Sequence, residues 1–136
     1  MIPKLTVDSE KDVVFVEMRG MHLETQKDIR AFFDAIVAFW RARCGGEKVY
    51  FIVCYDGFSV NLRENEYYAR QMKQCSDECA KTVVRYGGDD LQRSAARLRG
   101  MKIHSPSNLY ATREEAIEVV RAIRTGAVSI ATRART

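Results

Sequence analysis

Hydrophobic and polar residues alternate with a short period at the start of the chain and with a helical period soon afterwards. Lys4–Asp8 alternates, Ser9–Asp12 is polar, and Val13–Met18 is rich in β-branched and aromatic residues. This pattern predicts an opening β-hairpin. From about Glu24 to Arg43, apolar residues recur at every third or fourth position, which predicts an amphipathic helix. These apolar positions are Ile29, Phe32, Phe33, Ile36, Val37 and Trp40.

Capping and turn residues mark where this helix begins and ends. Thr25 is placed to cap its first turn, and Gly45-Gly46 supplies the left-handed backbone that ends helices. Lys48–Tyr55 follows as a nearly continuous apolar run, which is typical of a strand covered on both faces. Asp56-Gly57 then predicts a turn.

The second half of the chain repeats the alternation of helix and strand. Asn61 is expected to begin a helix that extends to about Cys79, and Thr82–Tyr86 is expected to form a short strand. A further helix is predicted from Asp89 or Asp90 to Gly100. Ile103–Tyr110 contains Pro106 and favours a loop, with room for a stub of edge strand.

A capping box predicts the last helix. Thr112 is followed by Glu115 three residues later, and apolar residues from Ala116 to Ile123 share one face before Gly126. The whole order predicts an α/β fold with a mixed, mostly parallel sheet of four or five strands and about four flanking helices. We expect one domain over residues 1–126 and a loosely ordered basic tail over 127–136.

Length and composition agree with a single core. The chain has 136 residues, of which 46% are hydrophobic and 29% charged, an ordinary globular balance. No segment approaches the roughly 20 apolar residues that a membrane span needs. Its first residues lack the apolar stretch of a secretory signal. We therefore expect a cytoplasmic protein that does not enter a membrane.

Charge is distributed unevenly along the chain. The net charge is +4, with −2 over residues 1–80 and +6 over residues 81–136. A basic half is compatible with a nucleic acid or phosphate ligand, and equally with a solvated basic face. Because no motif with interleaved aromatic residues accompanies the charge, we expect no nucleic-acid partner.

The four cysteines do not have the spacing of a metal site. Cys75 and Cys79 are four residues apart and would share a helix face, while Cys44 and Cys54 are isolated. A helical pair supplies two of the four ligands that zinc needs. Buried thiols that pack as small hydrophobic groups account for the cysteines, so no metal or cofactor is expected.

Three segments resemble a known family. They are Lys48–Phe58, Thr82–Tyr86 and Tyr110–Ala116, and their order and spacing resemble the small C-terminal module of acyl-CoA:acetate/3-ketoacid CoA-transferases. That module's fold is similar to the STAS (anti-sigma-factor antagonist) fold. The chain departs from the family pattern at Cys54, where the module commonly has Asn, and at Gly87–Asp90, where it commonly has small hydroxyl residues.

The resemblance implies a role without catalysis. In the transferases the covalent chemistry belongs to a glutamate in large upstream domains, which this chain is too short to contain. We expect a regulatory or protein-interaction domain whose partner is a regulatory protein or an acyl-CoA-handling enzyme. The alternative is a domain that binds a small acyl or CoA-type anion. Self-association into a homo-oligomer is compatible with either.

Asp56, Gly57, Ser59 and Asn61 form the first candidate site. They follow a predicted central strand and lead into a helix, and in open α/β sheets ligands gather at the carboxyl ends of strands. Regulatory STAS proteins have a phosphorylatable serine after an aspartate, and Ser59 is the nearest match by resemblance. The alternative is local: Asp56 and Gly57 form a turn, and Ser59 and Asn61 cap a helix.

Arg85 and Tyr86 form the second candidate site. They end a predicted strand before Gly87-Gly88, so that Arg85 could hold a carboxylate or phosphate while the glycines allow close backbone approach. A tight turn explains the glycines equally well. No catalytic residues are predicted, because neither His22 nor His104 has a nucleophile or carboxylate at a recognised spacing.

Overall fold

A computed structural model of the chain describes residues 2–89, 94, 98 and 108–126. The predicted tail over residues 127–136 lies outside the described residues. The helix predicted from Asp89 or Asp90 to Gly100 falls on a segment in which only Asp89, Ser94 and Leu98 are described. Arg93, Arg97 and Arg99 within it, and His104 beyond it, are likewise outside the described residues.

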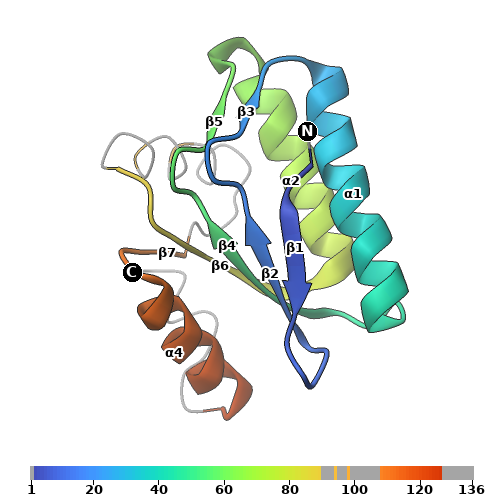
Figure 1. Cartoon of the computed structure of the whole chain (residues 1–136), viewed down its shortest axis with the longest axis vertical. Coiled ribbons are helices and arrows are strands. Elements are labelled where there is room, and N and C mark those ends of the chain that lie inside the picture. Colours follow the sequence, from blue (N-terminus) through green and yellow to red (C-terminus); the bar gives the residue numbers. More distant parts are fainter. Residues whose placement is uncertain (1, 90–93, 95–97, 99–107, 127–136) are drawn as a thin grey trace.

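The described residues form an α/β structure around a mixed five-stranded sheet (Figure 1). The strand order is β1-β2-β4-β6-β7, in which β1 is antiparallel to β2 and every other neighbouring pair is parallel. The predicted hairpin and mostly parallel sheet are therefore confirmed. The strands are β1 (Lys4–Val7), β2 (Val13–Glu17), β4 (Val49–Cys54), β6 (Ala80–Tyr86) and β7 (Leu109–Tyr110).

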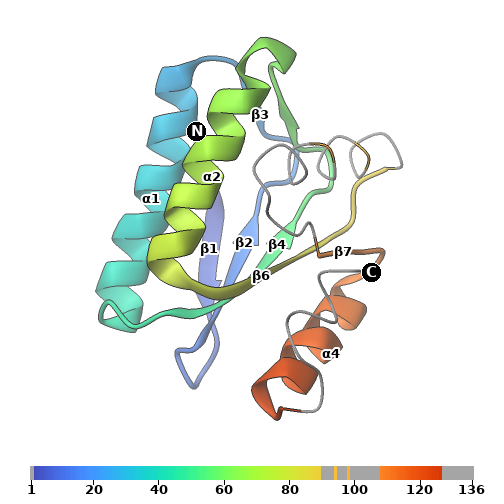
Figure 2. The ribbon, with the colours of Figure 1, turned by 180° about the vertical axis from the view of Figure 1, so that it is seen from behind.

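Helices cover both faces of this sheet, as the ribbon shows from two sides (Figures 1 and 2). Helices α1 (Gln26–Cys44) and α2 (Asn65–Cys79) pack side by side on one face, and α4 (Arg113–Arg124) packs on the other. The part of the chain that the structure describes thus contains three α-helices where the pattern predicted about four. The fourth predicted helix falls mostly outside the described residues; Ser94 and Leu98, which are described there, are helical.

Helix α1 begins and ends at the residues expected from the sequence. The Thr25 hydroxyl accepts a hydrogen bond from the Asp28 amide at 3.1 Å, and the Asp28 carboxylate accepts one from the Thr25 amide. This reciprocal capping box satisfies amide groups that have no partner within the helix. Gly45, with φ of +63°, ends the helix in the left-handed conformation.

Strand β4 is the central strand that its continuous apolar sequence predicts. It lies between β2 and β6, parallel to both. Phe51 faces the core under α1 and α2, whereas Tyr50 and Ile52 face the core under α4. Successive residues of β4 point alternately into the two cores, and both cores are buried. This explains why the segment shows no polar face.

Two local features differ from the expectation. A second, two-stranded parallel sheet pairs β3 (His22–Leu23) with β5 (Ser59–Val60), and neither strand is long enough to give a pattern in the sequence. The predicted helix from Asn61 is interrupted. Asn61 accepts a hydrogen bond from the Arg63 amide and caps a 3₁₀ turn, η1 (Leu62–Glu64), before α2 begins.

Truncating Ile52 tests the two-sided burial of β4. Ile52 is 2% exposed, so Ile52→Ala should lower the free energy of unfolding by about 2–5 kcal/mol in urea denaturation. Leu62, which is 84% exposed, supplies the matched control, and Leu62→Ala should change stability by less than about 0.5 kcal/mol. Equal effects of the two substitutions would show that β4 is not the core strand described here.

Candidate functional site

Asp56 follows β4 at the carboxyl edge of the sheet and joins three segments there. Its carboxylate accepts a hydrogen bond from the Gly88 amide at 2.8 Å and forms an ion pair with Arg19 at 2.9 Å. The Cys54 thiol lies 3.6 Å from the same carboxylate. An anion therefore already occupies this part of the edge, and it belongs to the protein.

These contacts favour the charged form of the Asp56 carboxyl group. The Gly88 amide is the main cause of a pKa below the usual value, with the Cys54 thiol and the Arg19 guanidinium acting in the same direction. Partial burial opposes them. The carboxylate is thus stabilised as the tie between the loop after β4 and the loop after β6.

Glycine is required where these loops approach one another. A Cβ on Gly87, which has φ of +81°, would lie 2.4 Å from the Asp56 carboxylate. A Cβ on Gly57, with φ of +67°, would lie 3.0 Å from the Gly20 amide nitrogen. The predicted turn at Asp56-Gly57 is confirmed, and the glycines after Arg85-Tyr86 serve this close approach.

Ser59 lies on the two-stranded sheet and is hydrogen-bonded to a histidine. Its Oγ is 2.7 Å from His22 Nδ1, and His22 Nε2 is 2.5 Å from a Glu24 carboxylate oxygen. Asn61 donates from its side-chain amide to the other Glu24 oxygen at 3.1 Å. We call these four residues, Ser59, His22, Glu24 and Asn61, the polar ribbon. All four side chains lie at or near the protein surface.

The polar ribbon follows from strand geometry. His22 is opposite Ser59 in the parallel register, and in extended chain residues two apart point to the same side. Glu24 and Asn61, each two residues further on, therefore join them. Sequence reasoning missed His22 and Glu24 as site residues, because the pairing of two-residue strands 37 positions apart leaves no periodic signal. Their i, i+2 spacing was the available hint.

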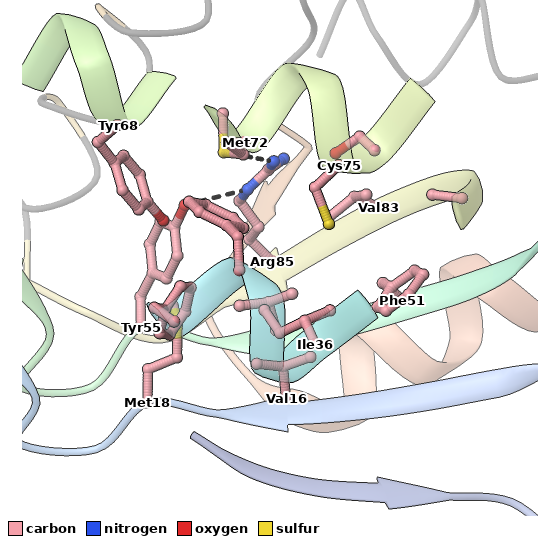
Figure 3. Close-up of a pocket in the computed structure, with 15 residues that line it drawn as sticks. Val16, Met18, Ile36, Phe51, Tyr55, Tyr68, Met72, Cys75, Val83 and Arg85 are labelled. Atoms are coloured by element: carbon pink, nitrogen blue, oxygen red, sulfur yellow. Dashed lines mark hydrogen bonds between the residues drawn. The ribbon is translucent and has the colours of Figure 1, made fainter. Parts of the chain in front are cut away.

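Arg85 and Tyr86, adjacent in sequence, point to opposite faces of the sheet. Arg85 is 5% exposed and faces α2, where its Nε donates to the Tyr55 hydroxyl at 3.1 Å and one terminal nitrogen contacts the Met72 sulfur at 3.2 Å (Figure 3). Tyr86 faces α4, and burial, with a contribution from Cys54, raises the pKa of its phenol to about 12. They do not form a joint anion site.

A small cavity lies beside Arg85, between the sheet and helices α1 and α2. Its volume is about 50 Å³, and Val16, Ile36 and Phe51 are among the apolar side chains that line it (Figure 3). The predicted site residues are thus distributed over three places. Asp56 and Gly57 lie where the loops after β4 and β6 meet, Ser59 and Asn61 belong to the polar ribbon, and Arg85 borders the cavity.

One cluster of carboxylates occurs among the described residues, at the turn between β1 and β2. Asp8, Glu10 and Asp12 come within reach of a common point. Arg124, from the end of α4, lies 2.6 Å from Asp12, 3.5 Å from Asp8 and 3.7 Å from Glu10. This guanidinium offsets part of the cluster's negative charge and ties the last helix to the hairpin.

Comparison with known proteins leaves the family relationship as a proposal. No protein-family model, curated protein or solved structure matches the chain. Among the described residues, none of the helices combines the length and apolar character needed to cross a bilayer.

Replacing Gly87 tests the close approach to Asp56. Gly87→Ala and Gly45→Ala both place alanine at positive φ, which costs about 1–2 kcal/mol, but only the first also meets a neighbouring group. We therefore expect Gly87→Ala to destabilise the protein by at least about 1 kcal/mol more than Gly45→Ala in urea denaturation. Equal losses would mean that the two loops are not packed as described.

The Asp56 contacts predict a specific pH dependence. Because the folded-state pKa of Asp56 is lowered, its contribution to stability is present above the unfolded pKa of about 3.9 and is lost as pH falls through the folded value. The stability difference between wild type and Asp56→Asn should be largest near pH 7 and should shrink below about pH 4. Urea titrations at several pH values measure this difference. A difference that stays constant from pH 7 to below about pH 4 would contradict the prediction.

Proposed function

We propose that the chain is a non-catalytic regulatory module of STAS-like type, which binds another protein through the surface that carries the polar ribbon. Two features support the proposal. Three segments of the sequence resemble the STAS-like module, and the sheet is mixed, with the antiparallel strand β1 at one edge. The observation on which it rests is the exposed Ser59 hydroxyl, hydrogen-bonded to His22 at 2.7 Å.

Phosphorylation of Ser59 would change this surface strongly. A phosphate adds about −1.5 to −2 charge and three acceptor oxygens. It would replace the hydroxyl contact with His22 and bring negative charge toward Glu24, which His22 and Asn61 now hold in place. The polar ribbon would then present two charge patterns, and a partner that binds one would be released by the other.

The polar ribbon contains the residue types of a Ser-His-Glu hydrolase, but its setting favours regulation over catalysis. The side chains of His22 and Glu24 are 50% and 60% exposed, so water screens the charges that an active site must stabilise. The lining of the cavity beside Arg85 includes neither Ser59 nor His22. A nucleophile there would lie outside that cavity, whose walls could not orient its substrate.

The chemistry of the partner follows from the resemblance. A regulatory protein or an acyl-CoA-handling enzyme would suit a module of this kind, with the cytoplasm as its compartment.

The switch is tested first by the modification state of the chain. Protein purified from its native cells should contain a fraction that is heavier by one phosphate, and fragment mass spectra should assign the phosphate to Ser59. Ser9, another exposed serine, should be unmodified in the same sample. A chain that is never phosphorylated at Ser59 under any growth condition would contradict the switch.

Partner binding supplies the second measurement. Once a partner is identified by in-cell crosslinking, its affinity for Ser59→Glu and Ser59→Ala should differ by tenfold or more, which corresponds to about 1.4 kcal/mol. Ser9→Glu serves as the matched control and should bind as wild type does. Equal affinities for the two Ser59 variants would show that this surface does not respond to charge.

A second candidate function is the binding of a small acyl anion. Its support is the buried Arg85 guanidinium at the wall of an apolar cavity. The volume of about 50 Å³ cannot contain CoA, so the candidate narrows to the acyl acid alone.

A further inference from the structure

The cavity beside Arg85 has the composition of a binding site for an amphiphilic molecule. The sheet contributes Val16, Phe51 and Val83 to its walls, and helix α1 contributes Phe32 and Ile36. The polar side chains at the cavity come from Arg85, Tyr55, Tyr68 and Ser76. An apolar space bordered by a few polar groups is typical of small-molecule sites.

Its charged group is cationic and buried. The Arg85 guanidinium remains protonated at any physiological pH and presents its donors in a plane that matches a carboxylate. Figure 3 shows it between the Tyr55 hydroxyl and the Met72 sulfur, beneath helix α2. A carboxylate at this position would gain charge-assisted hydrogen bonds in surroundings of low dielectric constant.

Helix α2 contributes partly exposed side chains to the cavity wall. Met72, Cys75 and Ser76 line the cavity and are only partly buried, in contrast to the fully buried Phe32 on the α1 side. Methionine is unbranched and adapts its shape readily. Its thioether is also a weak acceptor, so an incoming carboxylate can displace it from Arg85 at small cost.

The volume limits the length of the ligand. One water molecule needs about 10–15 Å³ of such space, so about 50 Å³ corresponds to roughly four water-sized positions. That is room for an alkyl chain of about four carbons.

We propose that this cavity binds a short-chain monocarboxylate, with its carboxylate on Arg85 and the Tyr55 hydroxyl and its alkyl chain between the sheet and helices α1 and α2. The proposal rests on the second candidate function above and names its ligand class. It is independent of the switch at Ser59.

The test measures the affinity of the full chain for a series of carboxylates. Acetate, butyrate, hexanoate and dodecanoate are titrated by calorimetry and by saturation-transfer NMR, with butyramide as the uncharged counterpart of butyrate. Each buried methylene should tighten binding about fourfold, so butyrate should bind about 15-fold more tightly than acetate. The gain should end beyond hexanoate, and butyramide should bind at least tenfold more weakly than butyrate.

Two variants assign the binding to the cavity. Cys75→Leu fills the space and should abolish butyrate binding while the protein remains folded. Gln74→Leu changes the exposed neighbouring position on α2, outside the cavity lining, and should bind butyrate as wild type does. Arg85→Gln should remove the preference for butyrate over butyramide. If Arg85→Gln does not fold, Cys75→Leu alone decides.

The possible failures are distinguishable. If no carboxylate binds to the wild-type chain, both the ligand class and the second candidate function are overturned. If carboxylates bind without dependence on chain length, or bind equally to Cys75→Leu, the chain binds anions elsewhere and the assignment to this cavity is wrong.

Discussion

The burial of β4 on both faces is the constraint from which the rest of the structure follows. A strand with apolar side chains on both sides must be covered by two layers. Helices α1 and α2 form one layer, and helix α4 forms the other. Its backbone is paired on both edges as well, with β2 and β6. Because the chain must leave such a strand at the sheet's edge, the polar residues that follow β4 gather there.

That edge is held together by one carboxylate and several glycines. Asp56 accepts from the Gly88 amide and pairs with Arg19, so the loops after β2, β4 and β6 share one anion. This arrangement divides the residues after β4, which the sequence suggested as one candidate site, into two groups. Asp56 and Gly57 stabilise the edge, while Ser59 and Asn61, a few residues further on, are left at the surface with His22 and Glu24.

Sequence patterns predicted those elements whose signals are local. The spacing from Ile29 to Trp40, the Thr25 cap and the apolar run of β4 each depend on neighbours within a few residues, and the structure confirms them. The contact of Ser59 with His22 depends on the pairing of two-residue strands, and the placement of Arg85 against Met72 depends on how α2 packs. No period in the sequence encodes such distant contacts, so the polar ribbon and the cavity could be found only in three dimensions.

Helix α2 passes into β6 without an intervening loop, since Cys79 ends the helix and Ala80 begins the strand. The Ala80 amide still donates to the Ser76 carbonyl, so the first residue of the strand also completes the last turn of the helix. One continuous stretch of chain therefore carries Met72 on the helix and Arg85 on the strand, and the strand ends beside Asp56.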